Sequence, residues 1–273
     1  MYADPAPDWA VAYYGRGLEE VRLTSGPGLL ERERTLELLR RYLPAAPARV
    51  ADIGAGPGPY SLWLAEQGYT VTARDLMPLH VKQLRSAARR RGLVVDAEVG
   101  DARGLDLPDQ AFDAVLLFGP LYHLLDREGR LQTLREAARI VAPGGVVLAV
   151  AISRWAAIMD GVLRLRLGEG DPGFGTLLDT LVATGRMEPL AEGAFAGFVH
   201  RPDELRAEAA EAGLRELALL SIEGPAAYLV DVEERWESPA ARDLVLDVAR
   251  RLEAVPELAG MGPHLMLVAE RTD

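Results

Sequence analysis

The stretch at residues 49–60, RVADIGAGPGPY, constrains the fold of this chain more than any other. Three glycines at alternate positions (Gly54, Gly56 and Gly58) follow a short apolar run, and a helix-like pattern begins at Pro59. Glycine adopts backbone angles that a β-carbon forbids and lets a ligand approach the main chain, and proline is tolerated at the first position of a helix. The stretch therefore predicts a strand, a tight turn and a helix, the arrangement at which open α/β sheets bind nucleotide-like ligands.

The spacing of the glycines bears on which ligand this turn binds. A dinucleotide fingerprint, G-x-G-x-x-G, requires its third glycine where Pro59 stands, so an NAD-dependent oxidoreductase ranks last. The pattern D-x-G-x-G-x-G instead resembles motif I of the class I S-adenosylmethionine (SAM) methyltransferases. SAM has no phosphate but carries an amino acid and a sulfonium cation, so a carboxylate beside the turn suits it and would repel a pyrophosphate. The resemblance implies that SAM is the cofactor and that the turn binds it through Asp52, Gly54, Ala55 and Gly56.

Composition excludes several classes of function. The 273 residues are 49% hydrophobic and 26% charged, which suits one large soluble domain. The net charge of −11 disfavours a nucleic acid as the main partner, because binding phosphates requires cationic surface. The chain has no cysteine, which rules out disulfides, thiol nucleophiles and thiolate metal sites, and we expect no metal. With no apolar run as long as a membrane span and no signal-like N-terminus, the expected location is cytoplasmic, with no membrane partner.

Strands and helices are predicted to alternate after the glycine turn, which favours a parallel, doubly wound sheet. The predicted strands cover residues 70–74, 94–99, 112–118 and 146–152, and the predicted helices cover residues 59–67, 78–91 and 129–141. Two later strands, at 214–222 and 264–269, resemble the antiparallel hairpin that ends the methyltransferase fold. We expect an α/β, Rossmann-like, doubly wound and mostly parallel seven-stranded sheet, with a helical N-terminal cap and helical insertions.

We expect a single methyltransferase domain over residues 1–273. Its parts are a helical cap (1–45), a SAM-binding core (46–152), a substrate lid (153–200) and a part that completes the sheet (201–273). The lid has no clear strand pattern and contains a glycine-rich stretch, and long irregular insertions are usually binding loops. Its large apolar side chains are expected to line an acceptor pocket, or else to be plain core: Trp155, Met159, Phe174, Met187, Phe195 and Phe198.

Acidic residues at the ends of the next two strands extend the resemblance. Asp75 lies about 20 positions past the glycine turn, where a carboxylate accepts hydrogen bonds from ribose hydroxyls; the alternative is a residue that only ends the strand. Leu76 would then flank the adenine. In the triplet GDA, the resemblance implies that Asp101 accepts a hydrogen bond from the adenine amino group and that the small side chain of Ala102 lets the adenine ring approach. The alternative is that Asp101 only caps its loop. Phe118, at the end of the fourth strand, joins the same expected site.

The loop after the fourth strand, within LFGPLYHL, resembles a bacterial subgroup of small-molecule methyltransferases. Tyr122 and His123 are the polar side chains expected nearest the reacting methyl group. A neutral histidine there takes a proton from the acceptor, or it only packs and binds; His200, just before a helix, is a second candidate base. In similar enzymes N-terminal helices close over SAM, so Tyr14 and Arg34 are candidate ligand contacts. The alternatives are that Tyr14 only packs in the core and that Arg34 lies on a solvated helix face.

These features predict a SAM-dependent methyltransferase that transfers a methyl group to an O or N nucleophile of a small, partly apolar metabolite. The resemblance covers residues 49–152 strongly and the terminal strands weakly. A non-catalytic SAM-binding protein and a methyltransferase acting on protein or RNA stay open as alternatives. A homodimer through the helices at residues 228–252 also stays open.

Overall fold

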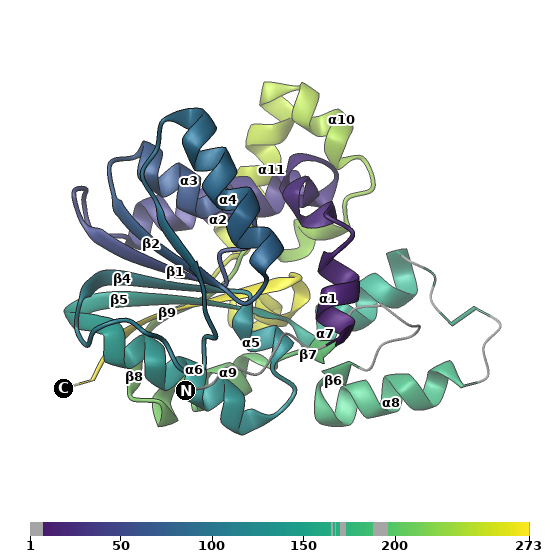
Figure 1. Ribbon diagram of the computed structural model, residues 1–273. Coiled ribbons are helices and arrows are strands. Elements are labelled where there is room, and N and C mark those ends of the chain that lie inside the picture. Colours follow the sequence, from purple (N-terminus) through teal and green to yellow (C-terminus); the bar gives the residue numbers. More distant parts are fainter. Residues whose placement is uncertain (1–7, 165, 167, 170–172, 188–195, 273) are drawn as a thin grey trace.

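A seven-stranded sheet runs through the centre of the computed structural model, which describes residues 8–164, 166, 168–169, 173–187 and 196–272 (Figure 1). The strand order is β3-β2-β1-β4-β5-β9-β8, and the first five of these strands are parallel to one another. β9 is antiparallel to both of its neighbours. The predicted doubly wound sheet with a terminal antiparallel hairpin is thereby confirmed.

The sheet is built from strands in the following positions. Its members are β1 (Arg49–Ile53), β2 (Thr70–Asp75), β3 (Asp96–Val99), β4 (Phe112–Phe118), β5 (Val141–Ile152), β8 (Leu214–Ser221) and β9 (His264–Arg271). The α-helices of the cap and core are α1 (Asp8–Tyr14), α2 (Pro27–Tyr42), α3 (Pro59–Glu66), α4 (Pro78–Arg91), α5 (Pro120–His123), α6 (Arg127–Ile140) and α9 (Pro202–Glu211). Two short 3-10 helices, η1 (Leu18–Glu20) and η2 (Arg22–Thr24), join α1 to α2.

Both faces of the sheet are covered, which explains why the central strand β4 reads as a nearly continuous apolar run. Along β4, Ala114 and Leu116 pack into a cluster with side chains of α2 and α3. Val115 and Leu117 point the other way, into a cluster with side chains of α6 and α9. Figure 1 shows α2, α3 and α4 above the sheet and α6 and α9 below it. The faces of the sheet are therefore packed against helices, and a ligand site is expected at the ends of the strands.

Two strands begin away from their predicted positions. β3 begins at Asp96, because the pairing with β2 starts there and exposed Val94 lies before it. β5 begins at Val141, because residues 142–145 form an irregularity inside a longer strand that pairs with β4 on both sides of it.

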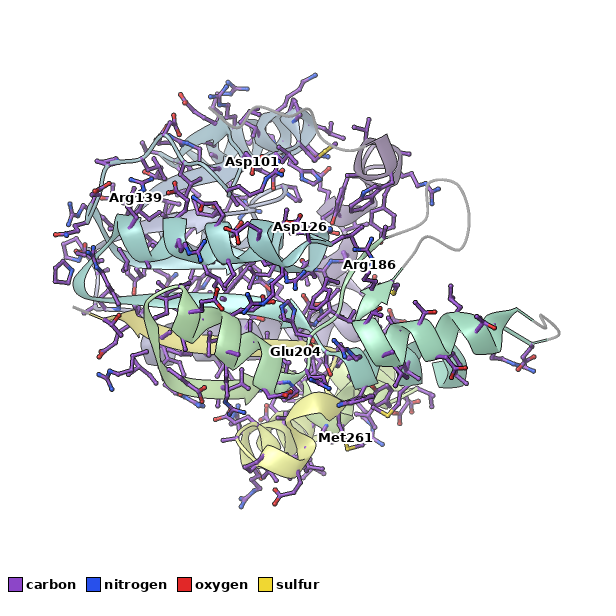
Figure 2. All side chains as sticks on the ribbon, turned by 90° about the horizontal axis from the view of Figure 1, so that it is seen from below. Asp101, Asp126, Arg139, Arg186, Glu204 and Met261 are labelled. Carbon is purple, nitrogen blue, oxygen red and sulfur yellow. The ribbon has the colours of Figure 1, made fainter. Side chains whose placement is uncertain are left out.

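The segment over 153–200 was predicted to lack strands, and this is wrong. It contains α7 (Arg154–Met159), a π-helix η3 (Asp160–Arg164), α8 (Phe174–Thr184) and two antiparallel strands, β6 (Arg186–Met187) and β7 (Gly197–Phe198). Two-residue strands are too short to show an alternating pattern, which is why the sequence did not indicate them. Figures 1 and 2 show α8 standing out from the rest of the molecule.

The predicted helical insertion near the end of the chain covers part of α2. It consists of η4 (Gly224–Tyr228), α10 (Val232–Glu237) and α11 (Pro239–Leu252), followed by η5 (Pro256–Met261). Val232, Val245 and Leu246 of this insertion pack against Leu30 of α2. Within the described residues, no helix has the length and apolarity needed to cross a membrane.

Candidate active site

A cavity of about 470 Å³ follows one edge of the sheet, where the parallel strands have their carboxyl ends. Its volume is in the range of small-molecule sites. Asp101, after β3, and Asp75, on β2, lie at one end of the lining, Phe118 of β4 lies further along, and His264 of β9 lies at the other end. The strand order thus arranges the lining residues along one line.

The glycine turn after β1 forms the floor of the cavity. Gly54 N–H donates to the carbonyl of Arg74, at 2.8 Å. A Cβ on Gly54 would lie 2.5 Å from Cδ of Pro120, so glycine is required for the packing of the β1 and β4 loops. Gly56 has a positive φ of 57°, and a Cβ there would meet no described atom within 4 Å. The open space above Gly56 is what a ligand lying on the main chain requires.

Asp75 joins the glycine turn to the end of β2. Its Oδ2 accepts from the N–H of Gly56 at 2.7 Å, and its Oδ1 accepts from the N–H of Met77 at 2.8 Å. Nδ1 of His80 lies 3.0 Å from the same Oδ1. Asp75 and Leu76 both line the cavity. The carboxylate thus orders the turn and faces the ligand space, so the two roles considered for it do not exclude each other.

Asp52 is a buried carboxylate in the wall of the same cavity. Ser61 Oγ donates to its Oδ2 at 2.6 Å, while Oδ1 accepts no hydrogen bond from the described residues. Burial, assisted by the charge of Asp75 and opposed by the Ser61 bond, raises the pKa of Asp52 to about 6. The buried Oδ1 of Asp52, which has no described hydrogen-bond donor, suits a ligand group that is cationic or donates a hydrogen bond.

Asp101 and Ala102 line the end of the cavity at β3, together with Arg103, which the sequence reasoning missed. The guanidinium of Arg103 holds both oxygens of Asp101, with Nη2 at 2.6 Å from Oδ2 and Nε at 3.0 Å from Oδ1. The backbone N–H of Arg103 donates to Oδ1 at 2.9 Å, so Asp101 also caps its loop. An adenine amino group would have to share Asp101 with this arginine.

A cluster of rings forms the part of the cavity beside the β4 loop. The hydroxyl of Tyr14 lies 2.7 Å from Nε2 of His123, and the rings of Trp9 and Tyr122 pack against the same imidazole. Burial lowers the pKa of His123 to about 4 and raises the pKa of Tyr14. All four residues line the cavity, so the structure brings together the predicted residues Tyr14, Tyr122 and His123 around a neutral histidine.

Arg34 lies apart from the described lining of the cavity, so its predicted ligand contact does not fit the structure. Its side chain is fully buried, donates to the carbonyl of Ile222 at 3.2 Å and pairs with Glu37 and Glu253. The alternative of a solvated face is also wrong. Arg34 instead joins α2 to the chain after α11.

His200 also lies outside the described lining. Its Nε2 is 3.3 Å from Glu208 Oε2, and Arg130 Nη2 donates to the other oxygen of that carboxylate at 2.8 Å. Burial lowers the pKa of His200, against the opposing effect of Glu208. This histidine anchors the segment over 153–200 to α9, so its predicted role as a base does not fit its position.

The predicted apolar pocket of the lid does not coincide with this cavity. Phe195 lies outside the described residues, and the other candidates are absent from the described lining: Trp155, Met159, Phe174, Met187 and Phe198. The cavity is closed instead by the N-terminal cap, through Trp9, Leu23 and Thr35 among others. The sequence reasoning had named only Tyr14 and Arg34 of this cap as candidate ligand contacts.

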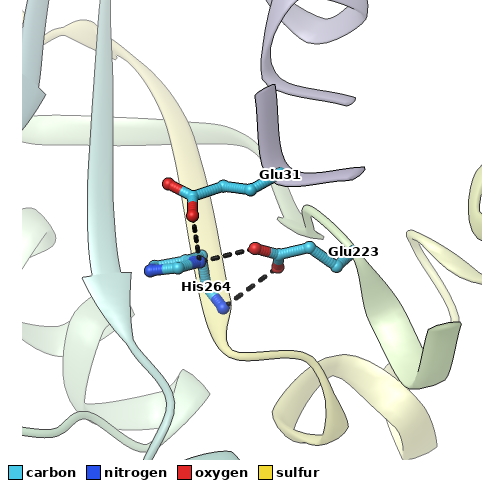
Figure 3. A group of neighbouring side chains, drawn as sticks. All are labelled: Glu31, Glu223 and His264. Atoms are coloured by element: carbon cyan, nitrogen blue, oxygen red, sulfur yellow. Dashed lines mark hydrogen bonds and ion pairs between the residues drawn. The ribbon is translucent and has the colours of Figure 1, made fainter. Parts of the chain in front are cut away.

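Four charged residues, which we call the charged end, occupy the cavity end nearest β9, and the sequence reasoning missed them: Arg22, Glu31, Glu223 and His264. Arg22 Nη1 donates to Glu31 Oε2 at 2.5 Å, and His264 Nδ1 lies 2.6 Å from Glu223 Oε1 and 4.0 Å from Glu31 Oε2 (Figure 3). Burial opposes protonation of His264, but Glu223 and Glu31 outweigh it and raise its pKa to about 9. These residues come from η2, α2, the loop after β8 and the start of β9, so no local motif indicates the group.

Comparisons with known proteins agree with this geometry. The family described as "Methyltransferase domain" matches residues 50–145. Demethylmenaquinone methyltransferase of Thermus thermophilus is 36% identical over 125 residues, which are 45% of this chain and 54% of that protein. Methyltransferase GfsG of Streptomyces halstedii is 30% identical over 191 residues, which are 69% of this chain and 60% of that protein. The curated relatives also include probable tRNA methyltransferases.

The match to the first two relatives thus spans only 54% and 60% of their lengths. A solved structure of a protein from Pyrococcus horikoshii shares the fold, with a TM-score of 0.64 at 16% identity, over 95% of this chain and 98% of that one. The glycine turn with its preceding aspartate, the strand order and these matches lead to one family: the chain belongs to the class I SAM-dependent methyltransferases.

Proposed function

We propose that this protein transfers the methyl group of SAM to an O or N nucleophile of a small, partly apolar metabolite. The observation that carries the proposal is the continuity of one cavity. It begins at the donor-binding residues of β1 to β3, passes the rings of Tyr122 and His123, and continues between Phe118, Val150 and Ile222. Donor and acceptor therefore have adjoining places in the same enclosed space.

The residues of the donor half fit SAM. The space above Gly56 receives the ligand at the main chain, and Asp75 faces it with a carboxylate suited to the ribose hydroxyls. Asp52 offers a spare buried acceptor oxygen near the turn, and Asp101 and Ala102 take the adenine end. When bound, SAM supplies an electrophilic methyl group on a sulfonium whose leaving group is a neutral thioether.

The contribution of this chain is positioning and exclusion of water. Holding two reactants in line corresponds to roughly 7–11 kcal/mol of the barrier. His123 is uncharged at neutral pH, because burial holds its pKa near 4, and it borders the space where the acceptor reacts. A neutral imidazole there accepts a proton from a hydroxyl or ammonium, and Tyr14 fixes the orientation of the ring through Nε2.

A small acceptor is favoured over a macromolecule by charge and by the size of the cavity. The net charge of −11 opposes binding of a phosphate backbone. The cap contributes Trp9 and Tyr14 to the ring cluster, and the cavity of about 470 Å³ has the volume of a small-molecule site. A non-catalytic SAM-binding protein would share the donor half but would have no use for the continued cavity.

The test is methyl transfer from radiolabelled SAM to a panel of phenols, alcohols, amines, carboxylic acids and thiols. Label on the phenols, alcohols or amines is the expected result, and His123→Gln is expected to lower kcat while leaving SAM affinity within about twofold. Label only on thiols or carboxylic acids contradicts the proposed nucleophile. SAM binding without label on any compound supports the binding-protein alternative, and transfer to bulk tRNA or to a peptide library supports the macromolecular one.

A further inference from the structure

The charged end lies at the end of the cavity opposite the donor half. Glu31 and His264 line the cavity, and Glu223 is buried behind them. Asp101, at the other end, follows β3, while His264 begins β9. Four strands, β2, β1, β4 and β5, lie between β3 and β9 in the sheet. The donor residues occupy the β3 to β1 side, so the charged end faces whatever fills the rest of the cavity.

The charges of this group already balance one another. Glu31 and Glu223 face two cations, Arg22 and the protonated imidazole of His264. Glu31, Glu223 and His264 do bring one possible metal-ligand atom each to within 4.8 Å of one another. However, Arg22 occupies the same Glu31 oxygen that lies nearest His264, and a divalent cation would have to displace both cations from it. The arrangement therefore suits a neutral ligand group better than an ion.

Two atoms of the charged end remain available on the cavity side. Arg22 and His264 approach only Oε2 of Glu31, and Oε1 accepts no hydrogen bond from the described residues. Nδ1 of His264 is held by Glu223, and Nε2 makes no hydrogen bond to the described part of the chain. In Figure 3 both of these atoms lie on the side away from Glu223. They present one acceptor and, on the protonated ring, one donor.

We propose that Glu31 and His264 recognise a hydroxyl group on the methyl acceptor, which donates to Glu31 Oε1 and accepts from His264 Nε2–H. A hydroxyl does both at once, whereas an ether or a carboxylate only accepts and an ammonium only donates. This inference rests on the proposed function, since it names the group that the same cavity recognises on its acceptor. It does not depend on whether that hydroxyl is methylated or only positions the molecule.

The side chains that line the cavity next to the charged end indicate what the rest of the acceptor is like. Tyr60, Phe118, Val150 and Ile222 line the space between the ring cluster and the charged end. Apolar walls with one pair of placed polar atoms suit a flat or aliphatic body that carries its hydroxyl at one end.

The experiment compares four matched probes by calorimetry, with and without saturating S-adenosylhomocysteine: 4-ethylphenol, 4-ethylanisole, 4-ethylbenzoate and phenethylammonium. We expect the phenol to bind about tenfold more tightly than the other three, because hydrogen bonds to charged groups are among the stronger ones. Glu31→Gln and His264→Gln should each remove most of this preference. Glu33→Gln is the matched control, because it makes the same change on the same helix at a more exposed side chain that pairs with Arg32.

Each other outcome has a defined meaning. No preference for the phenol in the wild-type protein, or a preference for the ammonium or the carboxylate, overturns the proposal, even where the variants fail to fold. Saturable Mn²⁺ binding that Glu31→Gln abolishes also overturns it and identifies a metal site. A wild-type protein that binds no S-adenosylhomocysteine contradicts the proposed function instead, while the probe series without it still decides the hydroxyl proposal.

Discussion

At the level of single residues, Asp75 holds the donor half together. Because its carboxylate accepts from Gly56 and Met77 and faces the cavity, Asp75→Asn should weaken SAM binding about tenfold or more, the loss expected for hydrogen bonds to a charged group. Isothermal calorimetry with SAM measures it. Asp106→Asn changes an exposed aspartate that pairs with Arg74 and should leave affinity unchanged; equal affinities in both variants would exclude a ligand role for Asp75.

His123 provides a second prediction at this scale. Burial holds its pKa near 4, so its imidazole should stay neutral through the pH range where an ordinary histidine titrates, near 6.5. Carbon-13 shifts of the histidine Cε1 atoms, assigned with His123→Gln, measure this directly. A His123 resonance that titrates near pH 6.5 would show that the ring is solvated and would remove the argument for a permanently neutral base.

Some charged residues of the cavity could be identified from the sequence, and others could not. Asp52, Asp75 and Asp101 each stand next to a strand end in a recognisable pattern, so their place at the cavity was predictable. The run E-R-E-R at residues 31–34 gives no such indication. Glu31 and Arg34 lie three residues apart on one face of α2, and they are the two of this run whose side chains turn inward, with 12% and 0% exposed. Their partners His264 and Glu253 come from the far end of the sequence, so only the folded chain shows which charges turn inward.

At the level of elements, Arg34 connects α2 with the chain after α11. Arg34→Ala leaves the buried carboxylate of Glu253 with Arg41 as its remaining described partner. Removing one partner of a buried ion pair typically costs about 3–5 kcal/mol of unfolding free energy, so we expect a loss of that order with little change in SAM affinity. Urea unfolding and calorimetry check the two parts.

The exposed neighbour Arg32 provides the control for that substitution. Arg32→Ala removes only a surface pair with Glu33, and surface changes of this kind usually stay within about 0.5 kcal/mol. A variant at Arg34 that folds stably but loses SAM binding would return Arg34 to the ligand site predicted from the sequence.

The elements themselves were predictable where their patterns were long. α4 and β4 have the bounds that the sequence predicts, because a proline start, a glycine stop and a continuous apolar run mark them. β6 and β7 were missed, because their pairing depends on contacts and not on a pattern. The side chains of residues 153–200 that were expected to line a pocket are absent from the described lining of the cavity. Ile222, just after β8, and His264, at the start of β9, line it instead.

At the level of the whole molecule, two histidines with shifted pKa values contribute to how stability varies with pH. The folded-state pKa of His264 is raised to about 9, so its contribution is fully present below about pH 6.5 and is lost as pH rises through 9. His123 has a lowered pKa of about 4, so stability falls as pH drops from 6.5 toward 4. Asp52, whose pKa is raised to about 6, acts in the opposite sense between pH 6 and 4. We therefore expect a clear decline of stability on the alkaline side and a flatter acid side.

Urea unfolding at pH 5, 6.5 and 9 tests this dependence. The shift of His264 from 6.5 to about 9 corresponds to at most about 3 kcal/mol between pH 6.5 and 9. His264→Gln should flatten this alkaline decline and leave the acid side unchanged. An equally steep alkaline decline in the variant would assign it to other groups.

The place of β9 between β5 and β8, rather than at an edge, affects how the molecule is completed during synthesis. Chains are made from the N-terminus and fold as they emerge, so β8 leaves the ribosome before the strand that ties it to the sheet. The donor residues up to Asp101 are made long before. His264 begins β9, so closing the sheet and adding the last wall of the cavity are one event. A nascent chain stalled before this strand would have the donor turn but would lack His264 at the charged end of the cavity.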